Sequence, residues 1–310
     1  MDTDNPGATR RGLRVALVSC TALPDLDPDD RLLLTPLAHL GVRVEAAVWS
    51  DPVVDWTSYD LTVIRSPWDY PTRRDAFVTW AEKVDGLANP AAVIAWNTDK
   101  RYLRELVAAG VPAVHTQWVA PGEAWAPGDA GEYVVKPAVS VGSRDTGRYD
   151  LADPGHRRLA REHVARLGAA GRTTMIQPYL RAVDTAGETA LIFLRDPAVG
   201  RLAFSHAIRK GPMLTGPHLG VNEGLYVPEE VCARTARPAE LAVGERALAA
   251  VPGGPDRLLY ARVDLIPGSG GEPVLVELEL TEPSLFLALA PGAADRFAAA
   301  IAALATARPR

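Results

Sequence analysis

Apolar and polar positions follow one pattern in the N-terminal third of this chain and another in the remainder. In the N-terminal third, short apolar runs rich in β-branched residues are separated by longer stretches with helical periodicity. The pattern predicts strands at residues 13–19, 42–49, 61–65 and 93–96, with helices at 29–40 and 73–84. Strands that alternate with helices in this way are typical of a parallel, layered α/β domain.

Beyond residue 97 few apolar runs are followed by a helix. Helices are expected from a cap at Thr98 or Asp99 to residue 109, at 157–167 and in the alanine-rich C-terminal stretch. Strands are predicted at 115–119, 133–136, 173–177, 189–194 and 202–208. This order favours a largely antiparallel α+β body. The Gly- and Pro-rich stretch 211–228 predicts a long mobile loop.

Residues 261–280 contain the sharpest local signal. Two segments there alternate charged and apolar residues, the period of strands with one buried face, around a Gly-Gly pair that favours a hairpin turn. That turn places Asp264 opposite Glu277 and Arg262 opposite Glu279. Carboxylates this close raise at least one pKa unless a cation intervenes, so Mg²⁺ is the expected ligand. The alternative is an exposed strand face with solvated charges.

Lysine is rare in this chain, with four lysines among the 33 basic residues. A lysine supplies a compact point charge that is common at phosphates, whereas arginine suits bidentate recognition. Lys83 lies in a polar helical stretch and is expected at the surface. Lys100, Lys136 and Lys210, taken with the acidic hairpin, indicate a nucleotide triphosphate site. Codon bias that thins lysines at random is the alternative.

Composition bounds the remaining possibilities. The 310 residues, 47% hydrophobic and 23% charged, suit a soluble globular protein of two or three domains. A net charge of −5 provides no basic surface for nucleic acid, and no apolar run reaches the ~18 residues of a membrane span. Residues 1–12 lack a signal-peptide core and are expected to form a disordered tail. Cys20 and Cys232 suggest no disulfide framework, which is compatible with the cytoplasm.

In their order along the chain, these motifs resemble the ATP-grasp superfamily of D-alanine–D-alanine ligase, glutathione synthetase and RimK-type ligases. The matching pieces are Asn-Thr-Asp-Lys100, Val-Val-Lys136-Pro, Gln177-Pro-Tyr, Gly187-Glu188, Arg262-x-Asp264 and Glu277-x-Glu279. The resemblance implies an α/β and α+β fold. It would consist of an N-terminal domain at 13–96, a central ATP-binding domain at 97–176 and a C-terminal antiparallel-sheet domain at 177–310, with residues 211–228 as a lid.

The resemblance also implies roles for single residues. Three groups would contact ATP: the phosphate-binding Lys100 and Lys136, the loop residues Ser140, Gly142 and Ser143, and an adenine hinge of Gln177, Pro178, Tyr179 and Leu180. Glu188, or alternatively Asp184, would hold the ribose. Asp264, Glu277 and Glu279 would bind two Mg²⁺ ions, although the family usually has Asn where this chain has Glu279. The catalytic candidates are Arg262, for the oxyanion, with Arg209 and Lys210.

Within the superfamily, several stretches look most like the O-ureido-serine cyclo-ligases of D-cycloserine biosynthesis. They include the segment after the third predicted strand and the Phe204–Lys210 and Glu279–Ser284 stretches. That likeness implies intramolecular ring closure on a carboxylate activated by ATP. The candidate substrate residues are Arg65, Ser66, Trp68, Asp69, Tyr70 and His206. Ordinary packing remains the alternative for Trp68 and Tyr70, and a simple hydrogen bond for His206.

Two further functions stay open from the sequence. One is an intermolecular amino-acid or peptide ligase on the same fold, which needs an acceptor amine. The other is an ATP-binding protein without catalysis. The expected partner is a small amino-acid-like substrate, with no nucleic acid and no membrane. Members of the superfamily often form dimers or tetramers, so a homo-oligomer also stays open.

Overall fold

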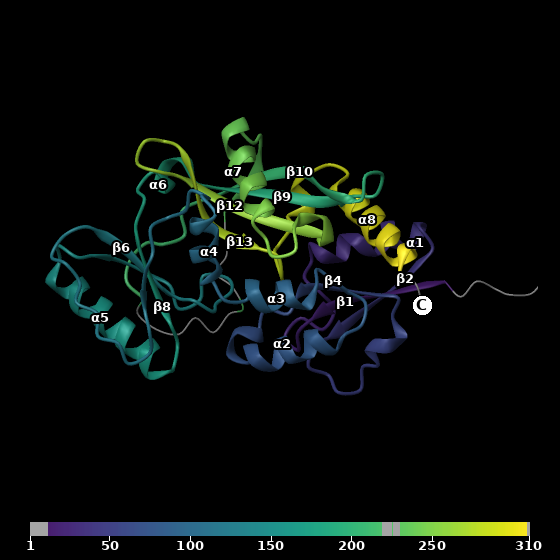
Figure 1. Cartoon of the computed structure of the whole chain (residues 1–310), viewed down its shortest axis with the longest axis horizontal. Coiled ribbons are helices and arrows are strands. Elements are labelled where there is room, and N and C mark those ends of the chain that lie inside the picture. Colours follow the sequence, from purple (N-terminus) through teal and green to yellow (C-terminus); the bar gives the residue numbers. More distant parts are fainter. Residues whose placement is uncertain (1–11, 219–224, 226–229, 309–310) are drawn as a thin grey trace, which may run out of the picture.

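The computed structural model describes residues 12–218, 225 and 230–308, and these residues form three sheets (Figure 1). The first sheet is parallel throughout and has the order β2-β1-β3-β4. Its strands are β1 (Leu13–Ser19), β2 (Val42–Val48), β3 (Leu61–Ser66) and β4 (Leu87–Ala88). Its helices are α1 (Leu34–His39), α2 (Arg74–Lys83) and α3 (Ala91–Asn97), with 3-10 turns at Asp30–Leu33, Trp56–Ser58 and Tyr70–Thr72. The predicted α/β domain is therefore confirmed.

The strand predicted at 93–96 is wrong, because these residues lie in helix α3. A short apolar run does not distinguish a buried strand from a buried helix, and here Pro90 precedes the first helical residue. The fourth strand is instead the two-residue β4. The helix predicted from Thr98 to 109 begins later, as α4 (Tyr102–Ala108), and Gly110 follows its end with a φ of 83°.

The second sheet is antiparallel, with the order β5-β8-β6-β7. It consists of β5 (Gln117–Val119), β6 (Glu132–Pro137), β7 (Gly147–Asp150) and β8 (Thr174–Pro178). Helix α5 (Pro154–Ala169) starts at Asp153, whose side chain accepts hydrogen bonds from two backbone N–H groups of the first turn. Its apolar face covers the sheet through Ala160, Val164 and Leu167. In Figure 1 this small lobe stands apart from the other two sheets.

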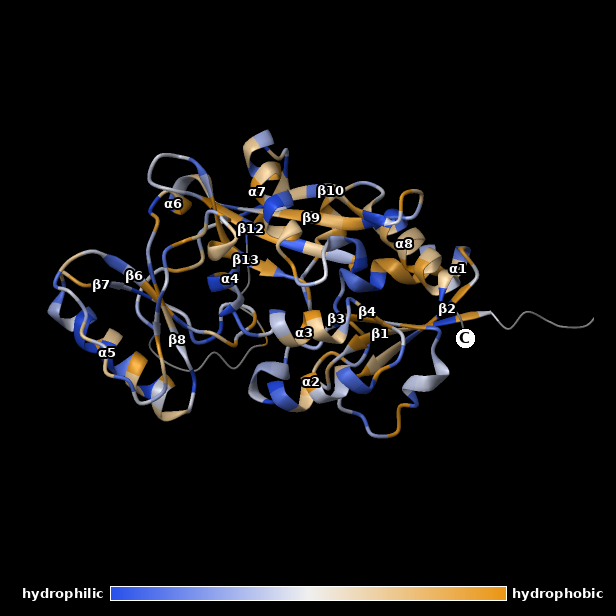
Figure 2. Cartoon of the chain, in the orientation of Figure 1, coloured by the Kyte–Doolittle hydropathy of each residue, from blue (hydrophilic) through white to orange (hydrophobic). Residues whose placement is uncertain are grey.

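The third sheet, also antiparallel, has the order β11-β10-β9-β12-β13. Its strands are β9 (Glu188–Asp196), β10 (Arg201–Lys210), β11 (Val231–Arg234), β12 (Tyr260–Pro267) and β13 (Pro273–Glu279). The associated helices are α6 (Val183–Ala186), α7 (Pro238–Ala249) and α8 (Ala293–Ala307), with 3-10 turns at Pro255–Arg257 and Leu287–Leu289. Helices α7 and α8 cover the sheet, whose middle strands β9 and β12 are strongly apolar (Figure 2). The antiparallel body and the C-terminal helix are confirmed, whereas β7, β11 and α7 were not predicted.

The predicted hairpin register is confirmed where it matters for the site. Arg262 pairs with Glu279 and Asp264 with Glu277, as a turn at the Gly-Gly pair requires. A register shift after Asp264 then moves the pairing by one residue toward the turn. The shift leaves the charged residues on one face of the hairpin.

Two buried asparagines join the first sheet's domain to this hairpin. The Asn89 side chain donates to the carbonyls of Tyr260 and Leu280, at 3.0 and 2.7 Å. The Asn97 amide donates to the Leu278 carbonyl at 2.7 Å and accepts from the Leu280 N–H at 2.7 Å. Because these amides satisfy backbone groups that β13 leaves unpaired at the sheet edge, the N-terminal domain holds the acidic strand in place.

Several sequence predictions concern residues that the structure does not describe or test. The tail predicted at 1–12 lies outside the described residues except for Gly12, and so does most of the second half of the predicted 211–228 lid. The predicted domain boundaries remain a prediction. Among the described residues, no helix combines the length and the hydropathy needed to cross a membrane.

Candidate active site

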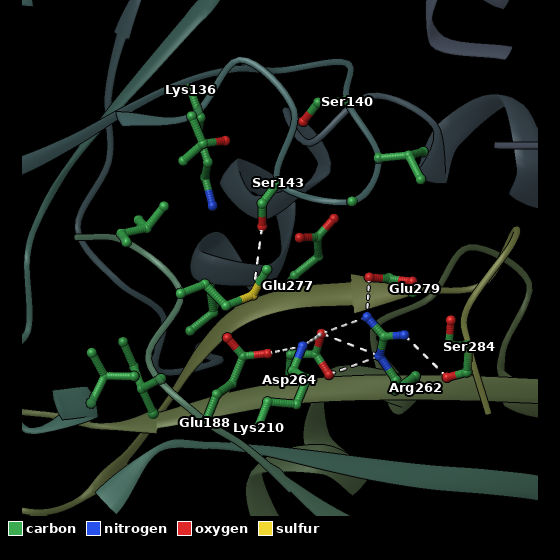
Figure 3. A pocket seen from close by; sticks show the side chains of 18 of the residues that line it. Lys136, Ser140, Ser143, Glu188, Lys210, Arg262, Asp264, Glu277, Glu279 and Ser284 are labelled. Atoms are coloured by element: carbon green, nitrogen blue, oxygen red, sulfur yellow. Dashed lines mark hydrogen bonds and ion pairs between the residues drawn. The ribbon is translucent and has the colours of Figure 1, made fainter. Parts of the chain in front are cut away.

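A cavity of about 520 Å³ opens between the two antiparallel sheets and is closed at one end by residues of the N-terminal domain. Most predicted site residues line it. They are Trp68, Lys100, Lys136, Ser140, Gly142, Ser143, Gln177, Pro178, Tyr179, Leu180, Glu188, Lys210, Arg262, Asp264, Glu277 and Glu279. The cavity therefore brings together side chains that are far apart in the sequence (Figure 3).

The floor of the cavity is a network of alternating charges on β12 and its neighbours. The Arg262 guanidinium donates to both Asp264 oxygens, at 2.9 and 3.0 Å, and also to the Glu279 carboxylate. The Lys210 ammonium lies 3.0 Å from Asp264 and also pairs with Glu188. Figure 3 shows this chain of contacts running from Glu188 to Ser284, whose carbonyl accepts from Arg262 at 3.1 Å.

The opposite wall carries the other two predicted phosphate lysines. The Lys100 ammonium lies 3.0 Å from Glu277 and donates to the Ser140 carbonyl at 2.7 Å, so it fixes the loop after β6. Lys136 is buried, and its side-chain ammonium makes no hydrogen bond or ion pair with another described residue. Burial lowers the pKa of Lys136, because desolvation disfavours the charged ammonium. In Figure 3 its side chain points toward the carboxylates across the cavity.

Two carboxylates of the hairpin have opposite pKa shifts. Burial raises the pKa of Asp264, but Arg262 and Lys210 outweigh it and hold the pKa at about 2. Burial raises the pKa of Glu279 to about 8, and Glu277 and Asp264 add to that rise against the opposing charge of Arg262. The prediction that at least one acid of this cluster has a raised pKa is therefore met at Glu279.

The end of the cavity near β8 is mainly apolar. Val114, Val134, Val183, Ile266 and Val276 line it beside the predicted adenine hinge. The Gln177 amide donates to the Thr116 hydroxyl at 2.9 Å, which fixes its side chain. An apolar lining of this kind suits a heteroaromatic base.

The loop after β6 has an unusual backbone. Gly142, Ser143 and Asp145 all have a φ between 56° and 60°. Such left-handed positions turn successive N–H groups in ways that form anion-binding concavities. Asp145 holds the far side of the loop through Arg166 at 2.9 Å and His218 at 3.4 Å. Ser140, Gly142 and Ser143 of this loop line the cavity.

Two predicted ATP and catalytic candidates lie outside the cavity lining. Asp184 is partly exposed and contacts Tyr179 and Arg148 instead of the cavity. Arg209 points away from its neighbour Lys210, because successive residues of a strand face opposite sides. Its guanidinium donates to the carbonyls of Ala186 and Thr185, at 3.0 and 3.1 Å, at the end of α6.

Of the predicted substrate residues, Trp68 alone is among the described residues that line the cavity. Arg65 is fully buried, 2.9 Å from Asp30, and Ser66 is buried against Ser19. The Asp69 carboxylate accepts from Trp49 and Arg73, at 2.7 and 2.6 Å. The Tyr70 ring stacks on Phe77 in the core. His206 is held by the Leu285 carbonyl at 2.8 Å, the simple hydrogen bond that the sequence left open as its alternative.

Sequence reasoning missed five residues that line the N-terminal end of the cavity, namely Asp27, Asp29, Glu282, Ser284 and Phe286. The first two follow β1 at its carboxyl end, where the rule for parallel sheets places ligands. The other three follow β13, just after the last predicted metal ligand. Asp29 joins the two segments, because its carboxylate accepts from the N–H groups of Leu287 and Ala288 at 2.9 Å.

The lining fits a magnesium ion by its chemistry, although the described residues do not form a metal site in their present arrangement. No group of three acidic, histidine or cysteine side chains among the described residues is arranged to hold a metal ion. The reason is that the hairpin carboxylates point to Arg262, Lys210 and Lys100. Counted over the described residues, seven carboxylates and four basic side chains line the cavity, a formal charge of −3 (4 − 7). Such an excess of hard oxygen donors suits Mg²⁺, which takes its other ligands from substrate phosphates and water.

The protein is similar to known proteins in sequence and in structure. Residues 15–92 match the family described as D-cycloserine synthetase DcsG, N-terminal domain. The cycloserine biosynthesis protein DcsG of Streptomyces lavendulae is 37% identical over 311 residues, which cover 94% of this chain and 98% of that protein. The crystal structure of D-cycloserine synthetase DcsG superposes with a TM-score of 0.79 at 36% identity, covering 93% of this chain and 98% of that one.

More distant structures share the fold alone. A RimK domain ATP-grasp protein of Sphaerobacter thermophilus has a TM-score of 0.63 at 16% identity, over 94% of this chain and 99% of that one. D-alanine–D-alanine ligase of Bacillus anthracis, in its complex with ATP, has a TM-score of 0.58 at 14% identity, over 94% and 95%. The fold and the relatives together define the class: this protein is an ATP-grasp ligase. Because the identity to DcsG extends over nearly the whole of both chains, the chain belongs to the DcsG family.

Proposed function

We propose that this protein closes the ring of D-cycloserine by activating the carboxylate of O-ureido-D-serine with ATP. The observation that carries the proposal is the cavity itself, in which Lys100, Lys136 and Lys210 face an acidic hairpin. The match to DcsG over 98% of that protein's length supports the choice of substrate. The ligand would be a small amino-acid-like molecule, with neither nucleic acid nor membrane as partner.

ATP would lie with its base in the apolar end of the cavity beside Gln177 and Leu180 and with its phosphates between the two walls. Lys136 suits the phosphates best, because its ammonium has no carboxylate partner among the described residues. Lys100 would reach the same phosphates while it holds the Ser140 loop. Glu188 would accept from the ribose hydroxyls. Positioning and charge neutralisation of this kind supply most of the catalysis in phosphoryl transfer.

Asp264, Glu277 and Glu279 would hold two magnesium ions together with the phosphates. Bound Mg²⁺ supplies charge neutralisation to the transferring phosphoryl group. The protein would offer carboxylates that now pair with basic side chains. With the metal on the carboxylates, those basic side chains would be available to the phosphates. A glutamate at 279, where the family usually has asparagine, adds one negative charge to that site.

The proposed reaction has three steps. A carboxylate oxygen of the substrate attacks the γ-phosphorus and releases ADP, which leaves an acyl phosphate. The ureido nitrogen attached to oxygen then attacks the carbonyl carbon of the same molecule, loses its proton to the solvent and expels phosphate. The carbamoyl group is finally lost by reaction with water, as carbon dioxide and ammonia. Arg262 stabilises the oxyanion that forms at the carbonyl during ring closure, since its guanidinium is fixed by Asp264 and the Ser284 carbonyl.

An intramolecular nucleophile needs no acceptor pocket, and orientation alone supplies a large part of its rate.

The test is phosphate release with O-ureido-D-serine and other O-substituted serines, each with and without a second amino acid, and mass detection of the product. We expect release with O-ureido-D-serine alone and a product of the mass of cycloserine. Release that depends on an added amine would support the intermolecular ligase instead. ATP binding without turnover on any substrate would support a non-catalytic protein. We also propose that the enzyme is cytoplasmic.

A further inference from the structure

Glu282 is a buried acid of the cavity that differs from the neighbouring acids in its partners. Its side chain is 8% exposed and lines the cavity. The other acids of this wall, Glu188, Asp264, Glu277 and Glu279, each pair with a lysine or arginine. Glu282 forms no ion pair with any described residue, and its side-chain partner is the neutral hydroxyl of Tyr70.

Two contacts hold Glu282 in place, one at its backbone carbonyl and one at its carboxylate. The Trp68 indole donates to the Glu282 backbone carbonyl at 3.1 Å. The Tyr70 phenol lies in the core, and burial raises its pKa well above the usual range, so it stays a donor. Burial also raises the pKa of Glu282, to about 7, against the opposing effects of the Tyr70 hydrogen bond and of the charges on Lys100 and Arg262. A fixed, desolvated carboxylate of this kind is a ready partner for a cation.

The position of Glu282 shows which cation fits. Two residues further along, the Ser284 carbonyl accepts from Arg262, the residue assigned to the oxyanion of the reacting carbonyl. An α-amino acid has its ammonium on the carbon next to that carbonyl. A substrate whose carboxyl lies beside Arg262 therefore carries its ammonium toward the segment that contains Glu282. Trp68, which also lines the cavity here, covers this end.

We propose that Glu282, oriented by Tyr70, binds the α-ammonium group of the substrate and so restricts the enzyme to α-amino acids. This inference rests on the proposed function for its substrate. Glu282 is a specificity residue, because its carboxylate touches the substrate away from the reacting atoms. A site that pairs a buried polar group with the substrate rejects an analogue without that group, since the group is then left unpaired.

The test measures binding, so that it does not depend on turnover. Calorimetry with a non-hydrolysable ATP analogue and Mg²⁺ would give Kd for O-ureido-D-serine and for 3-(ureidooxy)propanoate, which lacks the amino group. We expect the wild type to prefer the amino acid by about 10²-fold, and Glu282→Gln to remove most of that preference. The Kd of the ATP analogue should change by less than about threefold, because Glu282 lies outside the proposed nucleotide contacts.

Matched variants complete the experiment. Glu272→Gln, at an exposed position near the hairpin turn, should leave every Kd unchanged. Tyr70→Phe should give a partial loss of the preference, since the carboxylate stays but loses its donor. Equal weakening of both ligands by Glu282→Gln, or an unchanged preference, would overturn the inference. If the wild type binds as expected but shows no turnover, the proposed function fails while the ammonium site stands; if it binds neither ligand, both fail.

Discussion

Two buried arginine–aspartate pairs in this protein have the same chemistry and different surroundings. Arg65 and Asp30 lie 2.9 Å apart with side chains 0% and 4% exposed, and the guanidinium lies over the rings of Tyr260 and Phe297. Arg262 and Asp264 also lie 2.9 Å apart and are nearly as buried. The second pair, however, lines the 520 Å³ cavity and shares its charges with Lys210 and Glu279.

The comparison shows that burial alone does not identify a functional charge. Arg65 also donates to the Pro283 carbonyl at 2.7 Å, so all its surroundings are protein and its charge is already balanced. It joins the N-terminal domain to the segment after β13. Arg262 belongs to a charge network with an open side, where an incoming ligand can exchange partners with the side chains. We infer that the enclosed pair stabilises the fold and the cavity pair performs chemistry.

The largest expected effect is loss of turnover on removal of a cavity charge. Lys136→Ala should lower phosphate release by about 10²- to 10³-fold, the scale seen when one donor to a developing charge is lost. Glu277→Ala should do the same through the metal site. Thermal unfolding should be little changed in both, and Lys83→Ala, an exposed lysine at the end of α2, serves as the control. Undiminished turnover in either cavity variant would contradict the assignment.

The enclosed pair should show the reverse behaviour. Arg65→Met leaves Asp30 buried without a partner, and loss of one member of a buried pair costs about 3–5 kcal/mol. We expect a clear fall in the denaturant midpoint, while the KM for ATP of the folded fraction stays near the wild-type value. Arg65→Met combined with Asp30→Leu should recover part of the stability. A variant that folds normally but does not bind substrate would restore Arg65 to the substrate site.

A third buried group, which has no charge partner, gives a pH-dependent test. Burial lowers the pKa of His163 to about 4, and its Nδ1 lies 2.8 Å from the neutral Tyr149 hydroxyl. Since the folded-state pKa lies below the unfolded value near 6.5, the fold favours neutral histidine. Stability should therefore be full above pH ~6.5 and decline as the pH falls toward 4. His163→Phe should flatten that part of the stability profile; an unchanged profile would show that other groups cause it.

The smallest expected effect comes from two neighbours in the sequence. Lys210 faces Asp264 in the cavity, whereas Arg209 holds carbonyls at the end of α6. Lys210→Met should therefore reduce turnover strongly, and Arg209→Met should change it by less than about threefold, as an exposed contact implies. Equal losses in the two variants would mean that Arg209 also reaches the ligand during the reaction.

Part of the site could be predicted because it depends on local rules. The alternation of charge in residues 261–280 fixes which side chains share a face, and two of the rare lysines, Lys100 and Lys136, mark the opposite wall. The substrate end could not be predicted, because it depends on how separate domains pack. Arg65 and Trp68 leave the same strand end, yet one is enclosed by α8 and the other reaches the cavity. The Glu279–Ser284 stretch drew attention by its resemblance, but no role for Glu282 could be predicted, since nothing in the sequence shows that Tyr70 would lie beside it.

The wrong strand at 93–96 has a similar cause. The apolar run in α3 is too short to distinguish helical from strand periodicity. The hydrogen bonds of Asn97 to β13 and Leu280 hold this segment as a helix. The correct predictions at 189–194, 202–208 and in the 261–280 hairpin rest on longer runs.

The central claim is that the cavity charges activate a substrate carboxylate with ATP before ring closure. The most direct measurement uses O-ureido-D-serine labelled with heavy oxygen in its carboxylate, and mass analysis of the phosphate released. An acyl phosphate breaks between carbon and oxygen when nitrogen attacks, so the account predicts phosphate that carries one oxygen atom from the substrate. Phosphate without the label, formed in step with the cyclic product, would contradict it.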